Sequence, residues 1–164
     1  MRTVNLQLSK ELKANGYPQD CCEGGYYSNY GINEIGESDD YYHSGRVSKN
    51  DLWEREDNEI EHLDYHHAFF LQRAKKQHEE LDIQLIASPT ADEILDRLPA
   101  EDNLVIKCWG WTDEHGDRTY VCQTESQDQD NYTPEVFEEN SLADACARMY
   151  IYLKKEGLLG EEGK

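Results

Sequence analysis

The residues best placed for metal chemistry in this sequence are Glu59, His62 and His66. Intervals of three and four residues put all three on one face of a helix, where a carboxylate and two imidazoles suit a transition metal such as zinc. The HExxH motif is absent, and the spacing brings no fourth ligand nearby. A metal-binding protein or metal-dependent enzyme is therefore an alternative interpretation, beside the simpler one of a polar helix flank, and no other cofactor is expected.

The five cysteines could supply a nucleophile, but their pattern does not favour one. They lie at positions 21, 22, 108, 122 and 146, an odd number without a CxxC motif, and we expect reduced thiols. Cys146 falls on the apolar face of a predicted helix, and Cys108 and Cys122 lie in two predicted strands whose pairing would bring them close. No GxSxG, Walker or GxGxxG motif occurs, so no catalytic residue is predicted and we expect a protein that is not an enzyme.

The charge of the chain is strongly negative, with 35 Asp and Glu against 16 Lys and Arg and a net charge of -19. Such a field repels nucleic acid and anionic membranes and favours a basic protein surface. Five acids in the central segment recur at spacings of three and four and so share one helical face: Asp51, Glu54, Asp57, Glu61 and Asp64. Such a row can imitate the phosphates read by a nucleic-acid-binding protein. The alternative is a solvated face that the helix dipole favours.

A segment rich in Tyr and Gly, residues 17–47, has no helical period and is predicted to be irregular, with room for a short hairpin. It contains Tyr26, Tyr27, Tyr30, Tyr41 and Tyr42. No Lys or Arg occurs between residues 17 and 45, which disfavours stacking on nucleic-acid bases. Because Tyr offers contact area at a low entropic cost, we expect these rings at a protein interface; the alternative is that they cover a sheet.

The element expected to carry the acidic row is a long amphipathic helix from about Ser48 to Leu81, with Asp57 as a second possible start. Ser48 and Asp51 have the spacing of a capping pair. The apolar face of this helix is formed by residues at spacings of three and four: Ile60, Leu63, His67, Phe70, Ala74, His78 and Leu81.

The remaining elements alternate between helices and strands. A short strand or extended entry at 4–8 precedes a helix at 10–15 that Ser9 caps and Gly16 ends. The other predicted elements are a strand at 82–87, a short helix at 91–98, strands at 104–111 and 118–124, and a helix at 142–155 capped by Ser141. They predict an α+β fold: a small, mainly antiparallel sheet with helices packed on one side, in a single domain over 1–160 with a frayed tail at 161–164.

Three segments resemble small phage and prophage proteins of unknown function. They are the opening LSKELKANGYPQ, the middle ASPTADEILDRLP and the closing SLADACARMYIYLKKEGLL. The resemblance implies a mobile-element origin and a shared scaffold, and it implies no activity. No apolar run approaches the ~20 residues of a membrane span, and the N-terminus lacks a signal-peptide stretch, so we expect a protein of the host cytosol.

These observations favour a non-enzymatic phage protein that binds a basic protein partner. A nucleic-acid mimic that inhibits a host defence or nucleic-acid-handling factor is the concrete version, with the acidic row and the tyrosines as contact surface. A structural, self-associating phage protein is a further alternative. The oligomeric state stays open.

Overall fold

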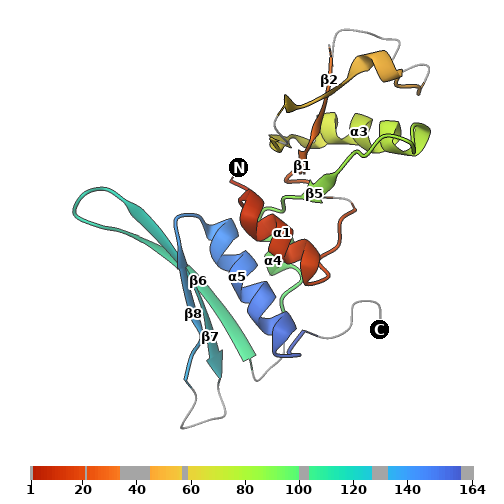
Figure 1. Cartoon of the computed structure of the whole chain (residues 1–164). Coiled ribbons are helices and arrows are strands. Elements are labelled where there is room, and N and C mark those ends of the chain that lie inside the picture. The colour runs from red at the N-terminus through yellow and green to blue at the C-terminus, as the bar shows by residue number, and fades with distance from the viewer. Residues whose placement is uncertain are drawn as a thin grey trace. The chain divides into compact units, whose positions relative to one another are not determined.

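Two compact units make up the chain, shown as a computed structural model in Figure 1. The structure describes residues 2–20, 22–33, 45–56, 59–99, 104–126 and 133–159. Unit 1 comprises Met1–Pro18 and Pro89–Lys164, and unit 2 comprises Gln19–Ser88, so the domain expected over 1–160 contains two separate cores. Both units combine helices with antiparallel strands, which confirms the α+β class. The expected tail at 161–164 lies outside the described residues.

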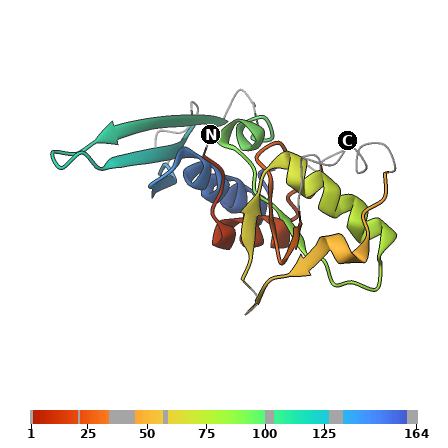
Figure 2. The ribbon, with the colours of Figure 1, turned by 90° about the horizontal axis from the view of Figure 1, so that it is seen from above.

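Unit 1 consists of a three-stranded sheet covered on one side by helices. Its elements are α1 (Leu6–Ala14), α4 (Ala91–Leu95), β6 (Leu104–Thr112), β7 (Arg118–Ser126), β8 (Val136–Glu139) and α5 (Leu142–Lys155). The antiparallel strands follow the order β6-β7-β8. Helix α5 packs on β7 and β8, and α1 and α4 pack against α5. In Figures 1 and 2 the β6–β7 hairpin extends well beyond α5, with its turn farthest from the helix.

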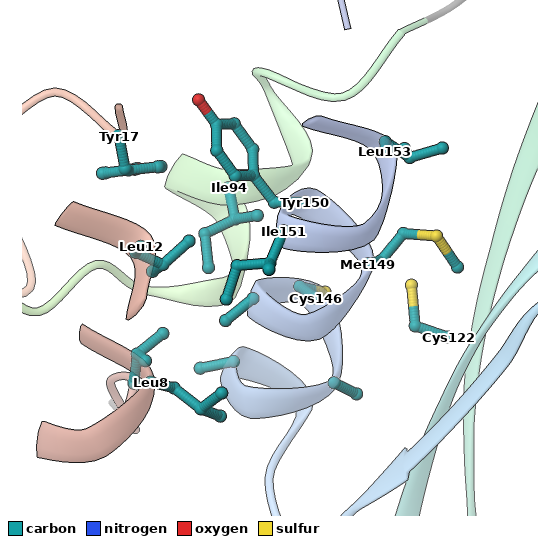
Figure 3. Packing of buried hydrophobic residues seen from close by; sticks show 14 residues of the cluster. Leu8, Leu12, Tyr17, Ile94, Cys122, Cys146, Met149, Tyr150, Ile151 and Leu153 are labelled. Atoms are coloured by element: carbon teal, nitrogen blue, oxygen red, sulfur yellow. The ribbon is translucent and has the colours of Figure 1, made fainter. Parts of the chain in front are cut away.

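The core of unit 1 forms around α5, which is apolar on both the side facing the sheet and the side facing α1. Leu8 and Leu12 of α1 and Ile94 of α4 approach one side, as Figure 3 shows, and Cys122 of β7 approaches the other. The predicted cap is present, because the Ser141 hydroxyl accepts a hydrogen bond from the backbone N–H at position 144, 3.1 Å away. A helix enclosed in this way is buried on most of its surface, which explains its long apolar sequence.

Helix α1 begins one turn earlier than the sequence predicted. Its N-cap is Asn5, whose side chain accepts a hydrogen bond from the N–H of Leu8, so the short strand or extended entry expected at 4–8 is wrong from Leu6 onward. Ser9, the expected cap, is buried inside the helix and its hydroxyl donates to the carbonyl of Val4. The earlier start places Leu8 and Leu12 on the same helical face, so that both reach the core.

The two other local predictions in unit 1 are confirmed. Thr90 and Glu93 form the capping box that opens α4. Strands β6 and β7 pair over their full length, and the Asp113 carboxylate closes their turn by accepting the N–H groups of His115 and Asp117, each 2.9 Å away. The chain order of hairpin, third strand and helix therefore follows from sequence signals that act over a few residues.

In its described residues, unit 2 places one α-helix beside two small antiparallel sheets. Its elements are β1 (Tyr26–Ser28), β2 (Tyr30–Ile32), the 3-10 helix η1 (Lys49–Asp51), β3 (Leu52–Glu54), β4 (Glu61–Leu63), α3 (Tyr65–Gln77) and β5 (Leu85–Ala87). One sheet has the order β4-β1-β5, and the other pairs β2 with β3. Leu71 and Ala74 of α3 pack with Tyr26 and Tyr30 of the strands in the core.

The long helix expected over 48–81 is wrong in its first half. The helix begins only at Tyr65, and the preceding residues form η1, β3 and β4. The reason lies in the Tyr-rich segment, which supplies β1 and β2 as partners for β4 and β3. Pairing across the chain therefore outweighs the helical spacing of the apolar residues. No helix among the described residues is long and apolar enough to cross a membrane.

Candidate functional site

The acidic row predicted on one helical face does not exist as a row. Asp51 lies in η1, Glu54 in β3, Glu61 in β4, and Asp64 is the N-cap of α3. Asp57 lies outside the described residues. Carboxylates in four different elements cannot keep the regular spacing of the phosphates along a nucleic-acid strand. The geometric basis for a nucleic-acid mimic in this segment is therefore wrong.

Several of these acids have local partners instead. The Asp51 carboxylate accepts the backbone N–H of the N-cap residue of its own 3-10 helix. The Asp64 carboxylate accepts the backbone N–H of His67 at 2.9 Å and lies 2.7 Å from the Nδ1 atom of the His67 ring. Glu61 forms an ion pair with Arg55, whose side chain is nearly buried. These contacts account for Asp51, Asp64 and Glu61 as structural groups of unit 2.

The alternative metal ligands also lie in different elements. Glu59 precedes β4, His62 lies within β4, and His66 lies in the first turn of α3, so their placement on one helical face is wrong. The Nε2 atom of His62 lies 3.0 Å from the carbonyl oxygen of Gly24, to which it donates. A shared metal ion at these three residues therefore lacks the geometry that suggested it.

Of the five tyrosines, two lie in the core of unit 2, one is half-buried and two lie outside the described residues. Tyr26 and Tyr30 are buried in unit 2, and the hydroxyl of Tyr26 accepts the N–H of Cys22 at 3.0 Å, so both are wrong as interface residues. Tyr27 is half-buried and contacts the His62 ring edge to face. Tyr41 and Tyr42 lie outside the described residues.

A more promising surface lies on the outer face of the β6–β7–β8 sheet, the face opposite α5. Side chains alternate along β6, so that Ile106 and Cys108 pack on the core of unit 1 while Trp109 and Trp111 point outward, 44% and 47% exposed. Val136 of β8 is exposed to a similar extent, 43%. We name Trp109, Trp111 and their neighbours on this face, Lys107, Glu125, Val136 and Glu138, the Trp face.

Acidic groups border the Trp face. One row of the sheet aligns Trp109 with Val121 and then with Glu138. Glu125 forms an ion pair with Lys107, which neutralises the cation on this face. Beyond Trp111 the strand enters a turn that contributes Asp113, Glu114 and Asp117. Two exposed aromatic rings therefore lie in a negatively charged surrounding.

The inner face of the same sheet holds a cluster of three cysteines. Cys108 and Cys122 are directly opposite each other in β6 and β7, with their Sγ atoms 3.1 Å apart. Cys146 of α5 joins them, and the three Sγ atoms all lie within 4.8 Å of one another. Figure 3 shows Cys122 and Cys146 between α5 and the sheet, beside Met149. Three thiols at this spacing suit either a soft metal ion or the formation of a disulfide.

The three thiols differ in exposure and acidity. Cys122 and Cys146 are fully buried, whereas Cys108 is half-buried. Hydrogen bonds from Cys122 and then Cys146 lower the pKa of Cys108 below its ordinary value. The same bonds, with burial, raise the pKa of Cys122 and of Cys146. Of the three thiols, Cys108, the one nearest solvent, is therefore the first to lose its proton.

Sequence reasoning identified part of both features. It left open that two predicted strands pair and bring Cys108 and Cys122 together, as they do in the structure, and it predicted that Cys146 is buried in an apolar helix face. It missed the meeting of Cys146 with the other two, because the sequence does not show which strand α5 covers. It also missed Trp109 and Trp111, although two Trp at alternate positions of a strand before an acidic turn are a usable signal. No family model, curated protein or solved structure matches the chain.

Proposed function

We propose that this protein acts, without catalysing a reaction, by binding a basic partner protein through the Trp face. The observation that carries the proposal is the exposure of Trp109 and Trp111 on one face of β6, 44% and 47%, within an acidic surrounding. Large aromatic side chains are over-represented among residues that dominate binding energies, and exposed apolar groups that lie together commonly mark interaction sites.

The chemistry of the Trp face suits Lys and Arg side chains. The face of an indole ring attracts a cation, which contributes about 0.5–2 kcal/mol per contact. Carboxylates such as Glu138 and those of the β6–β7 turn offer charge-assisted hydrogen bonds to the same cation. The net charge of -19 adds a long-range attraction that speeds the encounter with a basic surface.

A narrower form of the proposal concerns the class of partner. Nucleic-acid-binding proteins have basic grooves, and the resemblance of three segments to phage proteins fits an inhibitor of a host defence factor. The acids predicted to form a row do not form one, so they do not support this narrower form. It depends on the overall negative charge and on the resemblance to phage proteins. A partner recovered from host cells that is released by duplex DNA would support the narrower form, and a partner indifferent to DNA would restrict the proposal to its general form.

The direct test measures binding of a fluorescent peptide of about 12 residues rich in Lys and Arg by anisotropy. The double variant Trp109→Ala/Trp111→Ala should bind about 30-fold to 100-fold more weakly, because two cation–π contacts of about 1–1.4 kcal/mol each are lost. Affinity of the native protein should fall steeply between low and high salt. Absence of binding, or binding indifferent to salt, would refute the proposal.

A matched control is Trp53 of unit 2, which is 42% exposed but already stacks on its own cation, with the Arg55 guanidinium 4.6 Å from the ring centroid. Trp53→Ala should leave peptide affinity within about twofold, and an equal loss would show that the effect is not specific to the Trp face. Sedimentation at two concentrations tests the rival occupant, a second copy of the chain. A dimer that the double variant abolishes would also overturn the proposal.

A further inference from the structure

The Cys108–Cys122 pair has the backbone geometry that a disulfide requires. The two residues are directly opposite in the antiparallel register of β6 and β7. Residues in that position have Cα atoms about 4.5 or 5.5 Å apart, and disulfides bridge Cα atoms about 4.4–6.8 Å apart. Their sulfurs already lie 3.1 Å from each other. A bond between them thus needs a small rotation of two side chains and no strand movement.

The exposure of the thiols sets an order of reaction. Cys108 is half-buried and can meet a small reagent from solvent, whereas Cys122 and Cys146 are fully buried behind it. Cys108 also has the lowered pKa of the three, because the other two thiols donate hydrogen bonds to its sulfur. A thiolate near solvent with a second thiol next to it is the arrangement found at cysteines that oxidise reversibly.

We propose that Cys108 and Cys122 form a thiol–disulfide site that reacts with hydroperoxides, with Cys108 attacked first and Cys122 completing the bond. The Cys108 thiolate attacks one oxygen of the peroxide. An S–O bond forms and the O–O bond breaks, and the second oxygen leaves as hydroxide from hydrogen peroxide or as alkoxide from an organic hydroperoxide, the alkoxide then taking a proton from water to become alcohol. The sulfur of Cys122 then attacks Cys108, forming the S–S bond and breaking the S–O bond, while the Cys122 proton leaves with the departing oxygen as water. Two thiols lose two electrons and the peroxide gains two.

A metal ion explains the same cluster less well. Two thiolates bound to zinc at about 2.3 Å keep their sulfurs about 3.8 Å apart in tetrahedral geometry, which exceeds the observed separation. Among the described residues the group of ligating side chains contains three members, Cys108, Cys122 and Cys146, one fewer than a closed structural zinc site.

The test uses the full chain and a Cys21→Ala/Cys22→Ala variant that keeps only the three clustered cysteines. Reduced protein is treated with graded hydrogen peroxide, free thiols are alkylated after unfolding, and peptides are mapped by mass spectrometry. We expect one disulfide per chain in both proteins, joining Cys108 to Cys122, with Cys146 alkylated. Thiol reductant should restore the original mass.

Substitutions then separate the two roles. In Cys108→Ser the rate of peroxide oxidation within the cluster should fall at least about tenfold, since buried, protonated thiols react slowly. In Cys122→Ser, Cys108 should still react and be trapped as a sulfenic acid by a dimedone probe. Near-UV circular dichroism verifies that each variant is folded, and the native mapping decides the proposal if one is not.

Three results would overturn the inference. The first is native protein that stays fully reduced at peroxide concentrations that oxidise unfolded chain. The second is a bridge that maps to another pair. The third is stoichiometric zinc or copper in protein purified without chelator, with all three thiols protected from alkylation until chelator is added. The site is independent of the Trp face, so failure of either proposal leaves the other standing.

Discussion

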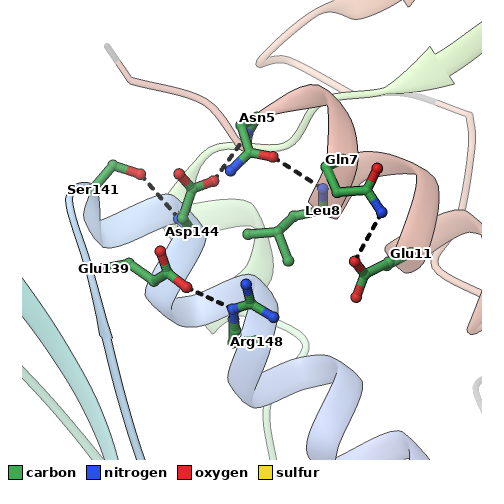
Figure 4. Close-up of polar contacts among 8 residues, drawn as sticks. All are labelled: Asn5, Gln7, Leu8, Glu11, Glu139, Ser141, Asp144 and Arg148. Carbon is green, nitrogen blue, oxygen red and sulfur yellow. Dashed lines mark hydrogen bonds and ion pairs between the residues drawn. The ribbon is translucent and has the colours of Figure 1, made fainter.

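The hydrogen bond between the first turns of α1 and α5 allows a quantitative test of how unit 1 is held together. A carboxylate oxygen of Asp144 accepts the backbone N–H of Asn5 at 2.9 Å, as Figure 4 shows. Asn5 is the N-cap of α1, and Asp144 is in the first turn of α5. One carboxylate therefore joins two helix N-termini that are 139 residues apart in sequence.

The expected cost of removing that carboxylate has two parts. A hydrogen bond to a charged acceptor contributes about 1.5–3 kcal/mol, and this one belongs at the lower end because it is exposed to water. The negative charge at the N-terminus of a helix contributes about 0.3–1 kcal/mol. Asp144→Ala should therefore lower the free energy of unfolding by about 2 kcal/mol. Asp144→Asn keeps the acceptor oxygen and loses only the charge, so about 0.5–1 kcal/mol is expected.

Urea unfolding followed by circular dichroism at low and high salt measures both variants. The stability order should be native, Asp144→Asn, Asp144→Ala, and salt should reduce only the difference between the first two. Glu156→Ala, an acid at the opposite end of α5, is the charge-matched control and should be neutral or slightly stabilising. The reasoning is refuted if Asp144→Ala lies within about 0.5 kcal/mol of the native protein, or if Asp144→Asn is equally damaging.

Two further predictions concern unit 2 and the hairpin turn. Burial lowers the pKa of His62 and outweighs the hydrogen bond to the Gly24 carbonyl, which raises it, so the folded state favours the neutral ring. The contribution of His62 to the free energy of unfolding should be full above about pH 6.5 and should be lost as the pH drops through the lowered pKa. Over this pH range the urea midpoints of His62→Gln should therefore decline less than those of the native protein. Equal declines would contradict this prediction. Gly25 has φ +99°, and an added Cβ would lie 2.2 Å from the Leu63 carbonyl oxygen, whereas Gly116 has φ +87° and open space. Gly116→Ala should lower the free energy of unfolding by about 1–2 kcal/mol, and Gly25→Ala should lower it clearly more. Equal urea midpoints of the two variants would disprove the clash at Gly25.

The elements that the sequence predicted correctly are those whose signals are local and agree with one another. Helix α5 has an N-cap, an apolar stripe and basic residues in its last turn, and all three indicate the same helix. The β6–β7 hairpin has two strand-like runs around a turn whose Asp113 closes it. When capping, periodicity and turn chemistry coincide, no distant partner is needed to decide the structure.

The failures share the opposite cause. Residues 52–54 and 61–63 have helical spacing, but each pairs with a strand from the Tyr-rich segment, and that pairing is invisible in the spacing of either partner. The candidate sites repeat the pattern. Cys108 and Cys122 lie opposite each other because a local turn joins their strands. The position of Cys146 beside them depends instead on how α5, which begins about 20 residues after Cys122, packs on the sheet.

The acids of this chain have two physical roles that the net charge alone does not separate. Asp51, Asp64, Glu93, Asp113 and Asp144 each accept a backbone N–H within the chain, so they belong to caps and turns. A hydrogen-bonded carboxylate keeps its charge, however, and still adds to the field that a distant partner meets. Counted on the sequence, unit 1 has 19 acids against 10 bases and unit 2 has 16 against 6, so both units contribute to that field. Under the proposed function, the field of all acids would set how fast a basic partner arrives, and the few side chains of the Trp face would set how long it stays.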